Sequence, residues 1–306
     1  MQNLTVIGVD NGYGNTKTAH HCFPTAVVHH GEKAPAFKND LLHYQGQYYT
    51  IGTGHKTFTA SKVEDEDTYL LTLAALAMEL KTRGLQSAKV FLAVGLPLTW
   101  VTTQKAAFKK YLLQNQSADF TFNGRPYHVD FAGCLVFPQG AAAVADRIEE
   151  LPGVTLIADI GNGTMNLMYV HEGKAQIDRC FTEKYGTHQC MLAAKEALLS
   201  KTGKVVDETS IEEVLRTGTA NISERYVTII RETAQHYVHG IFEKLAEHEY
   251  DPEAMELLIV GGGACLVRNF GEFARKRVTI IDDICANAKG FEYIAEGVLA
   301  KQGGMF

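Results

Sequence analysis

The strongest constraint on the fold is a phrase that occurs twice in the chain. Its first copy is LTVIGVDNGYGNTK at residues 4–17, and its second is TLIADIGNGTMNL at residues 155–167. In each copy an apolar run of strand length ends in an aspartate, a glycine-bearing turn follows, and a second strand-like run begins. The two aspartates, Asp10 and Asp159, lie about 150 residues apart, the length of an average domain. The repeat predicts a duplicated core with a cleft between its halves.

A strand that ends in such a turn suits the handling of phosphate. Glycines let the backbone adopt positive φ and approach a ligand closely, so that successive N–H groups can face anionic oxygens. A carboxylate at the strand end repels phosphate, but it can hold Mg²⁺ through water. We therefore expect Asp10 and Asp159 to lie near a magnesium ion. The glycines expected around the phosphates are Gly12, Gly14, Gly161 and Gly163.

Composition narrows the class of protein. The chain has 306 residues, of which 46% are hydrophobic and 21% charged, enough for two globular domains. A net charge of −6 disfavours direct binding of nucleic acid. The six cysteines form no C-x-x-C pair and no zinc spacing, which is typical of free thiols in a reducing cytoplasm. No apolar run reaches the roughly 20 residues of a membrane span, and strand-like sequence begins too early for a signal peptide.

The first half has the order βββ-α-β-α. Apolar patterning predicts strands at residues 4–9, 16–21 and 25–30, a helix at 68–83, a strand at 89–95, a helix at 100–114, and strands at 120–122 and 127–136. The first three strands are expected to form an antiparallel meander. Residues 31–67 are polar, with a hairpin at 41–51, and are expected to be a small inserted subdomain. The order of elements is not that of a doubly wound dinucleotide fold, and consistent with that, neither glycine turn completes G-x-G-x-x-G.

The second half repeats this plan and adds a third glycine cluster. Strands are predicted at residues 154–160, 164–171, 176–180 and 256–260, and helices at 188–200, 210–215 and 223–248. The last of these strands ends in Gly261, Gly262, Gly263 and Ala264, an unobstructed backbone that suits a nucleoside packed flat against it. Gly186, just before the helix at 188–200, is a further candidate for close approach of the ligand.

Two runs of small residues, 140–145 and 286–290, are expected to form crossing helices at a hinge. Gln139 stands at the entrance of the first. An amide between two phosphate turns could orient a water for in-line attack on a terminal phosphate, which is a positioning role and not proton abstraction.

Five segments in this order resemble the actin and sugar-kinase ATPase superfamily: two phosphate turns, two connecting helices and an adenosine loop. The first turn, residues 10–17, is close to the actin form of the motif, and residues 260–264 with 286–291 are most similar to bacterial plasmid-segregation actins of the ParM/StbA type. The resemblance implies an α/β fold of duplicated actin-like (ribonuclease-H-like) βββαβα domains around a central nucleotide cleft. The implied domains are residues 1–138 with 288–306, the inserted subdomain lying at about 31–67, and residues 139–287.

The resemblance also implies a site that binds ATP or GTP with Mg²⁺. Asp10 and Asp159 would lie around the metal and, with Gln139 as the residue that orients water, would form the catalytic set. The residues implied in nucleotide binding are Gly12, Tyr13, Gly14, Asn15, Lys17, Gly161, Asn162, Gly163, Thr164, Gly186, Gly261, Gly262, Gly263 and Ala264. Two of these depart from actin: Tyr13 replaces a serine that contacts phosphate, and Asn162 replaces an acidic residue.

The function implied by the resemblance is a filament whose dynamics are driven by nucleotide hydrolysis. Such filaments segregate plasmid DNA through a DNA-bound adaptor of the ParR type, so the chain itself needs no nucleic-acid surface and no membrane. Two alternatives stay open. One is a small-molecule kinase of the sugar or acetate type, which needs a carboxylate base near the terminal phosphate; Gln139 cannot serve, and Asp130 is the nearest acid in that stretch. The other is a nucleotide-binding scaffold that does not polymerise.

Overall fold

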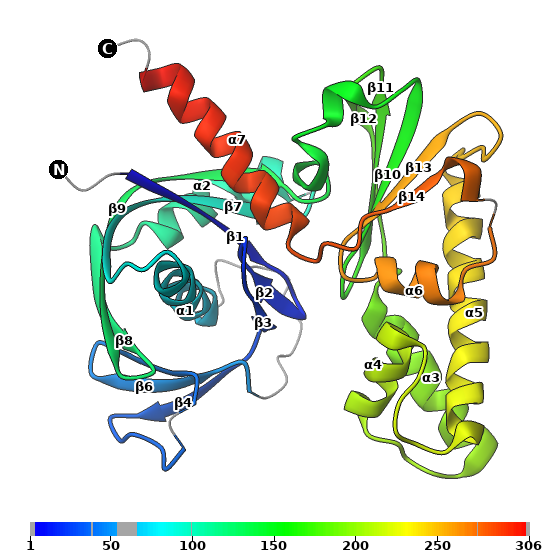
Figure 1. Ribbon diagram of the computed structural model, residues 1–306, viewed down its shortest axis with the longest axis horizontal. Coiled ribbons are helices and arrows are strands. Elements are labelled where there is room, and N and C mark those ends of the chain that lie inside the picture. Colours follow the sequence, from blue (N-terminus) through cyan, green and yellow to red (C-terminus); the bar gives the residue numbers. More distant parts are fainter. Residues whose placement is uncertain (1–3, 38, 54–65, 99, 274, 304–306) are drawn as a thin grey trace. The chain divides into compact units, whose positions relative to one another are not determined.

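The computed structural model describes residues 4–37, 39–53, 66–98, 100–273 and 275–303, and it divides into two units (Figure 1). The first unit comprises Met1–Asp146 and Ile284–Phe306, and the second comprises Arg147–Asp283. Residues 139–146, expected at the start of the second domain, therefore belong to the first unit.

A curved sheet of nine described strands forms the first unit. Its strand order is β3-β2-β1-β7-β9-β8-β5-β6-β4. The strands are β1 (Leu4–Asn11), β2 (Asn15–Lys17), β3 (Cys22–Pro24), β4 (Val27–Gly31), β5 (Leu41–Tyr44), β6 (Gln47–Ile51), β7 (Ser87–Leu96), β8 (Ser117–Phe122) and β9 (Arg125–Pro138). The helices are α1 (Asp67–Thr82), α2 (Val101–Leu112) and α7 (Ala286–Gly303), with a single 3-10 turn, η1 (Ala142–Val144).

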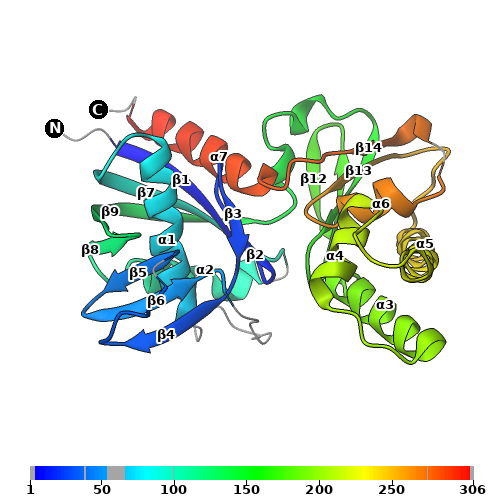
Figure 2. The same cartoon turned by 60° about the horizontal axis from the view of Figure 1, so that its bottom comes forward.

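Helix α1 lies in the hollow of this sheet, and α7 crosses its other face (Figures 1 and 2). The apolar side chains of α1 face the strands on nearly every side; Leu71, Leu73, Leu76 and Leu80 are all 0% exposed. This explains why the helix is apolar around most of its circumference, whereas a surface helix carries a single apolar stripe. The hairpin predicted at residues 41–51 is confirmed as β5 and β6, which extend the main sheet and share its core.

The predicted three-strand antiparallel meander is confirmed as β1-β2-β3, but its second and third strands have other bounds than predicted. Strand β2 ends at Lys17 because Thr18 N–H bonds His21 O (2.8 Å) and closes a turn there. The third strand is Cys22–Pro24 and not residues 25–30. Proline has no N–H with which to continue a ladder, and the chain turns at Pro24, whose carbonyl accepts the N–H of Ala26 (2.9 Å). Residues 27–31 become β4, which pairs with β6 at the far end of the strand order.

The second unit is a five-stranded sheet in the described part of the chain, with the order β12-β11-β10-β13-β14. Its strands are β10 (Val154–Ile160), β11 (Met165–His171), β12 (Lys174–Glu183), β13 (Glu256–Val260) and β14 (Val278–Ile280). Its helices are α3 (Thr187–Thr202), α4 (Glu208–Thr217), α5 (Glu224–Glu247) and α6 (Ala264–Phe270), with 3-10 turns η2 (Ile148–Glu150) and η3 (Arg275–Arg277). Each strand and helix predicted for this half is confirmed, with ends shifted by a few residues. None of the described helices combines the length and apolar character that a bilayer crossing requires.

An ion-pair cluster ties α1 and α7 to β1. Arg83, just after α1, donates to Val6 O (2.9 Å), to Glu292 of α7 (2.8 Å) and to Glu79 of α1 (3.2 Å). Burial raises the pKa of Glu79, but hydrogen bonds, including the N–H of His20, and the charge of Arg83 outweigh it, so the net shift of the pKa is downward. Burial also raises the pKa of Glu292, and there it prevails. Arg83 thus pairs with one buried carboxylate, Glu79, and one partly buried carboxylate, Glu292, and holds the last helix to the first strand.

Glycines let the backbone of α7 pack directly against the backbone of β1 and of η1. A Cβ on Gly8 of β1 would lie 2.0 Å from Ala288 O, and a Cβ on Gly290 would lie 1.7 Å from Ala142 O in η1. The run at residues 140–145, expected to be a helix, is only the turn η1. Gly140 has a φ of +82°, and its N–H is bonded by the side chain of Asn287 (2.9 Å). The small residues therefore serve close contact with α7 and not a helix of their own.

Gly290→Ala should lower the free energy of unfolding by about 1–3 kcal/mol, because the added methyl overlaps a backbone carbonyl that cannot move easily. Gly297→Ala, on the same helix, is the matched control. No described atom lies within 4 Å of its added Cβ, so it should be neutral or stabilising by up to about 1 kcal/mol. Urea unfolding of both variants measures the difference; equal stability of the two would contradict the packing described here.

Candidate functional site

The second glycine turn, residues 161–164 between β10 and β11, has all its carbonyl groups occupied. Three of them accept hydrogen bonds from the start of α3, and the fourth closes the turn. The bonds are Thr187 N to Gly161 O (3.0 Å), His188 N to Asn162 O (2.9 Å), Gln189 Nε2 to Gly163 O (3.1 Å) and Gly161 N to Thr164 O (2.8 Å).

This arrangement fixes the direction of the turn's N–H groups. In a planar trans peptide the N–H of each residue points opposite to the preceding carbonyl. Because the carbonyls of residues 161–163 face α3, the N–H groups of Asn162, Gly163 and Thr164 point away from it. The turn is uncovered beside Gly163, since no described atom lies within 4 Å of a Cβ added there. Successive N–H groups on one side of a turn form an anion-binding concavity.

In the first glycine turn, a single residue holds two of the carbonyl groups. Thr25, in the loop after β3, donates its Oγ1–H to Gly12 O (2.8 Å) and its N–H to Gly14 O (2.9 Å). By the same planarity, the N–H groups of Tyr13 and Asn15 point away from Thr25. Gly12 has no room for a side chain, because its Cβ would lie 2.6 Å from Asn15 O.

Three predicted site residues of the first unit come together around Asp10. This carboxylate is 2% exposed, at the end of β1. Gln139 donates its Nε2–H to one oxygen (2.5 Å), and the ammonium of Lys17, its neighbour across β1 and β2, lies 3.6 Å from the other. Gln139 reaches Asp10 because its own N–H continues the pairing of β7 and β9 by bonding Leu96 O (2.9 Å).

In the second unit, Asp159 lies beside the third glycine cluster. Asp159 is 5% exposed at the end of β10 and pairs with Val260 of β13. Gly261 has a φ of +86°, and a Cβ on it would lie 2.3 Å from Asp159 Oδ1. Gly263 donates its N–H to Ile160 O (2.8 Å), which folds the cluster against the strand end. Gly262 faces open space, with no described atom within 4 Å of its added Cβ.

Gly186 is needed for packing of the second turn. A Cβ on it would lie 2.2 Å from Asn162 O, and its carbonyl accepts the hydroxyl hydrogen of Tyr237 in α5 (2.7 Å). Its place in the sequence suggested close approach of a ligand, whereas the contact that requires glycine here is with the turn itself.

The side chain of Tyr13 packs against Trp100, the residue just before α2. Its ring lies edge to face on Trp100, with centroids 6.1 Å apart and planes at 88°. Burial raises the pKa of Tyr13, so the phenol stays protonated. Desolvation also raises the pKa of two thiols: in the first unit Cys22, opposite Lys17 in the β2–β3 pairing, and in the second unit Cys265, in the first turn of α6. These thiols are therefore not thiolate nucleophiles at neutral pH.

Thr25 and Gln189 were not identified from the sequence. Gln189 had a detectable signal: it is the third residue of a helix that follows Gly186, and its Oε1 accepts the N–H of Gly186 (2.9 Å), which is half of a capping box. Thr25 stands 13 residues after Gly12 and belongs to no motif.

Each unit offers one buried carboxylate at a strand end, Asp10 or Asp159, for a divalent cation. The described residues contain no group of three or more His, Cys, Asp and Glu side chains that could hold a metal directly. Hydrated Mg²⁺ suits such donors, because it keeps several waters and uses only one or two carboxylates.

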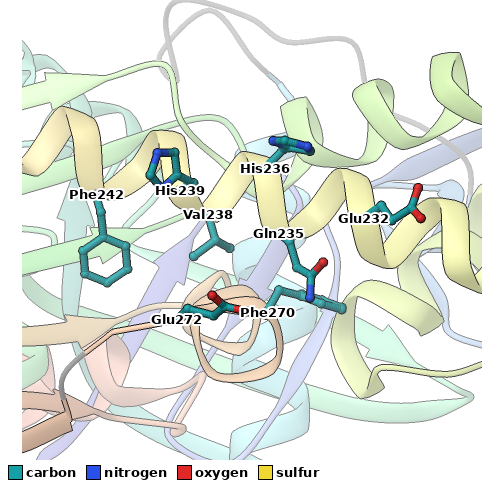
Figure 3. Close-up of a pocket in the computed structure, with 8 residues that line it drawn as sticks. All are labelled: Glu232, Gln235, His236, Val238, His239, Phe242, Phe270 and Glu272. Carbon is teal, nitrogen blue, oxygen red and sulfur yellow. The ribbon is translucent and has the colours of Figure 1, made fainter.

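A cavity of about 280 Å³ opens elsewhere in the second unit, between α5 and the end of α6 (Figure 3). Phe242, Val238 and Gln235 of α5 point toward Phe270 and Glu272, and Glu232, His236 and His239 complete the lining. These eight described residues include none of the site residues predicted from the sequence, so the cavity is separate from the glycine turns.

Two family models match the chain. The model of the N-terminal domain of actin-like proteins matches residues 8–141, and that of the C-terminal domain of the archaeal actin homologue, MreB-like, matches residues 157–271. No curated protein sequence matches.

Solved structures match over nearly the whole chain. Ta0583, an archaeal actin homologue, is 21% identical, with a TM-score of 0.74 over 97% of this chain and 99% of its own; it has also been solved with ADP. The apo pSK41 ParM protein is 15% identical, with a TM-score of 0.71 over 98% and 99% of the two chains. The Alp12 filament structure is 14% identical, with a TM-score of 0.68 over 97% and 99%.

Gly261→Ala should lower the free energy of unfolding by about 1–3 kcal/mol, because alanine is strained at positive φ and its methyl would overlap the Asp159 carboxylate. Gly262→Ala should change it by less than about 0.5 kcal/mol, since the added methyl meets open space. Denaturant unfolding without nucleotide compares the two, and a larger loss in the Gly262 variant would refute the described geometry.

Proposed function

We propose that this chain, which belongs to the actin-like ATPase superfamily, binds ATP or GTP with its two glycine turns and couples hydrolysis to filament assembly. Its fold is the duplicated α/β actin-like fold that the sequence predicts. The observation that carries the proposal is the orientation of the turns: donors from Thr25 and from α3 hold their carbonyls, and their N–H groups face the other way.

The proposed roles follow from these contacts. The N–H groups of Tyr13, Asn15, Asn162, Gly163 and Thr164 would hold phosphate oxygens, with Lys17 as the cation beside them. Asp10 and Asp159 would hold hydrated Mg²⁺, which neutralises phosphate charge when bound. Residues 261–264 would border the nucleoside, because Gly262 leaves an open backbone surface.

Gln139 is proposed to orient the attacking water. Its amide cannot take a proton, but it can hold a water by a hydrogen bond, which is the role that phosphoryl transfer to water requires. Its contact with Asp10 places it within hydrogen-bond reach of the carboxylate proposed to hold the metal.

Self-assembly is supported by the neighbours. Alp12 was solved as a filament, and a variant of pCBH ParM is described as non-polymerisable. A head-to-tail interface that does not close into a ring produces a filament. We extend the proposal to segregation of plasmid DNA through an adaptor of the ParR type. The net charge of −6 fits a chain whose contact with DNA is indirect.

The kinase alternative finds little support at Asp130. This residue lies in β9 eight positions before Pro138, which corresponds to roughly 26 Å along a strand. Its side chain is 50% exposed and lies 3.3 Å from His128, which also contacts Asp119. It is therefore a surface ion pair, remote from Asp10 and Gln139.

High-speed pelleting with simultaneous phosphate release tests the proposal. With ATP or GTP the chain should pellet and then release phosphate, whereas with ADP or no nucleotide it should stay in the supernatant. Asp159→Ala should abolish nucleotide-dependent pelleting because it removes the carboxylate proposed to hold the metal. Absence of pelleting over a wide range of protein concentration would contradict the filament proposal. Transfer of phosphate to a small molecule would favour the kinase alternative.

Gln139→Ala should slow phosphate release by about 10²-fold or more, because the attacking water loses its partner, while leaving triphosphate binding within a few-fold, because Asp10 loses one hydrogen bond but keeps Lys17 beside it. Gln139→Glu keeps a hydrogen-bond acceptor for the water and should retain more activity than the alanine variant. Single-turnover phosphate release, with affinity measured in parallel, separates the two effects. Equal loss of affinity and rate in both variants would assign Gln139 to binding instead.

A further inference from the structure

We propose that Gln189 is a positioning residue that holds the Thr164 N–H toward the phosphates of the bound nucleotide. The inference rests on the proposed function, because it assigns a role within the same nucleotide site. Gln189 lies in the first turn of α3 and contacts the 161–164 turn only through its side chain.

Both ends of the Gln189 amide are in use. Its Nε2–H donates to Gly163 O (3.1 Å), and its Oε1 accepts the N–H of Gly186 (2.9 Å). The opposite orientation of the amide would place oxygen against oxygen at Gly163 and nitrogen against N–H at Gly186. The two partners therefore determine which way the amide points.

The third peptide of the turn depends on this side chain. The carbonyls of Gly161 and Asn162 are held by backbone N–H groups of α3, which no side-chain substitution removes. The carbonyl of Gly163 is held by the Gln189 amide. Glycine at 163, with open space around its Cβ position, gives the 163–164 peptide little resistance to rotation.

Rotation of that peptide would reverse its effect on an anion. With Gln189 in place the Thr164 N–H points away from α3, alongside those of Asn162 and Gly163. If the peptide flips, the Gly163 carbonyl oxygen replaces the N–H, and a donor to phosphate becomes a group that repels it. Gln189 therefore keeps the third N–H donor of the turn, that of Thr164, on the same side as those of Asn162 and Gly163.

Tyr237 provides a matched control. Its hydroxyl donates to Gly186 O (2.7 Å), so it holds the same cap of α3 from the side of α5. That bond touches none of the four turn carbonyls. Tyr237→Phe thus removes one hydrogen bond from the helix cap without freeing the 163–164 peptide.

The experiment measures the affinity of the full chain for fluorescent ATP and ADP analogues with Mg²⁺, together with thermal unfolding of the free protein. Gln189→Met keeps the side-chain volume but removes the donor, and should weaken nucleotide binding about ten-fold. Gln189→Glu keeps the acceptor for Gly186 and places a second acceptor against Gly163 O, so it should weaken binding at least as much. Tyr237→Phe should weaken it less than about three-fold, with a similar shift in unfolding temperature.

Weakening by both Gln189 variants but not by Tyr237→Phe supports the inference. Equal weakening by Gln189→Met and Tyr237→Phe would overturn it, because the effect would then be that of a loosened helix cap. Wild-type affinity in the Gln189→Glu variant would also overturn it. If the wild-type chain bound neither analogue, the proposed function itself would fail, an outcome distinct from unchanged binding in the variants.

Discussion

A trans peptide keeps its C=O and N–H on opposite sides, and both glycine turns depend on that constraint. In the first unit Thr25 engages the carbonyls of Gly12 and Gly14, and in the second the start of α3 engages those of residues 161–163. By holding the carbonyl oxygens, these donors direct the N–H groups of the same peptides to the opposite side of the turn. Satisfying the carbonyl acceptors in this way leaves backbone N–H donors on the opposite side of each turn.

The parts of the candidate site that could be proposed from the sequence lie within a few residues of one another. Asp10 with Gly12 and Asp159 with Gly161 stand at fixed short spacings, and alternating apolar residues mark the strands that carry them. The partners that orient the turns come from further along the chain. Gln189 is 26 residues from Gly163, and Gln139 is 129 from Asp10. Such pairs are created by the packing of α3 against the turn and by the register of β7 and β9, which no local pattern encodes.

The wrong predictions, a helix at residues 140–145 and a third meander strand at residues 25–30, have the same cause: tertiary contacts outweigh the local sequence pattern. Small residues at 140–145 have the composition of a helix, but Gly140 takes a φ of +82° and its N–H is bonded by Asn287 of the last helix. Residues 27–31 have the composition of a third meander strand, but the chain turns at Pro24 and they pair with β6. In both cases the partner that decides the conformation is distant in sequence.

The tyrosine at position 13 bears on how much side-chain change the proposed phosphate site can tolerate. Relative to actin this position loses a serine hydroxyl, and the ring that replaces it packs edge to face on Trp100. The N–H of Tyr13, however, takes its direction from the bond between Thr25 and Gly12 O, which does not involve the side chain at 13. The exchange therefore removes one side-chain contact and leaves the amide in place. A turn that binds through its amides can change a side chain at its tip and still bind phosphate, provided that Thr25 and the glycines beside it are kept.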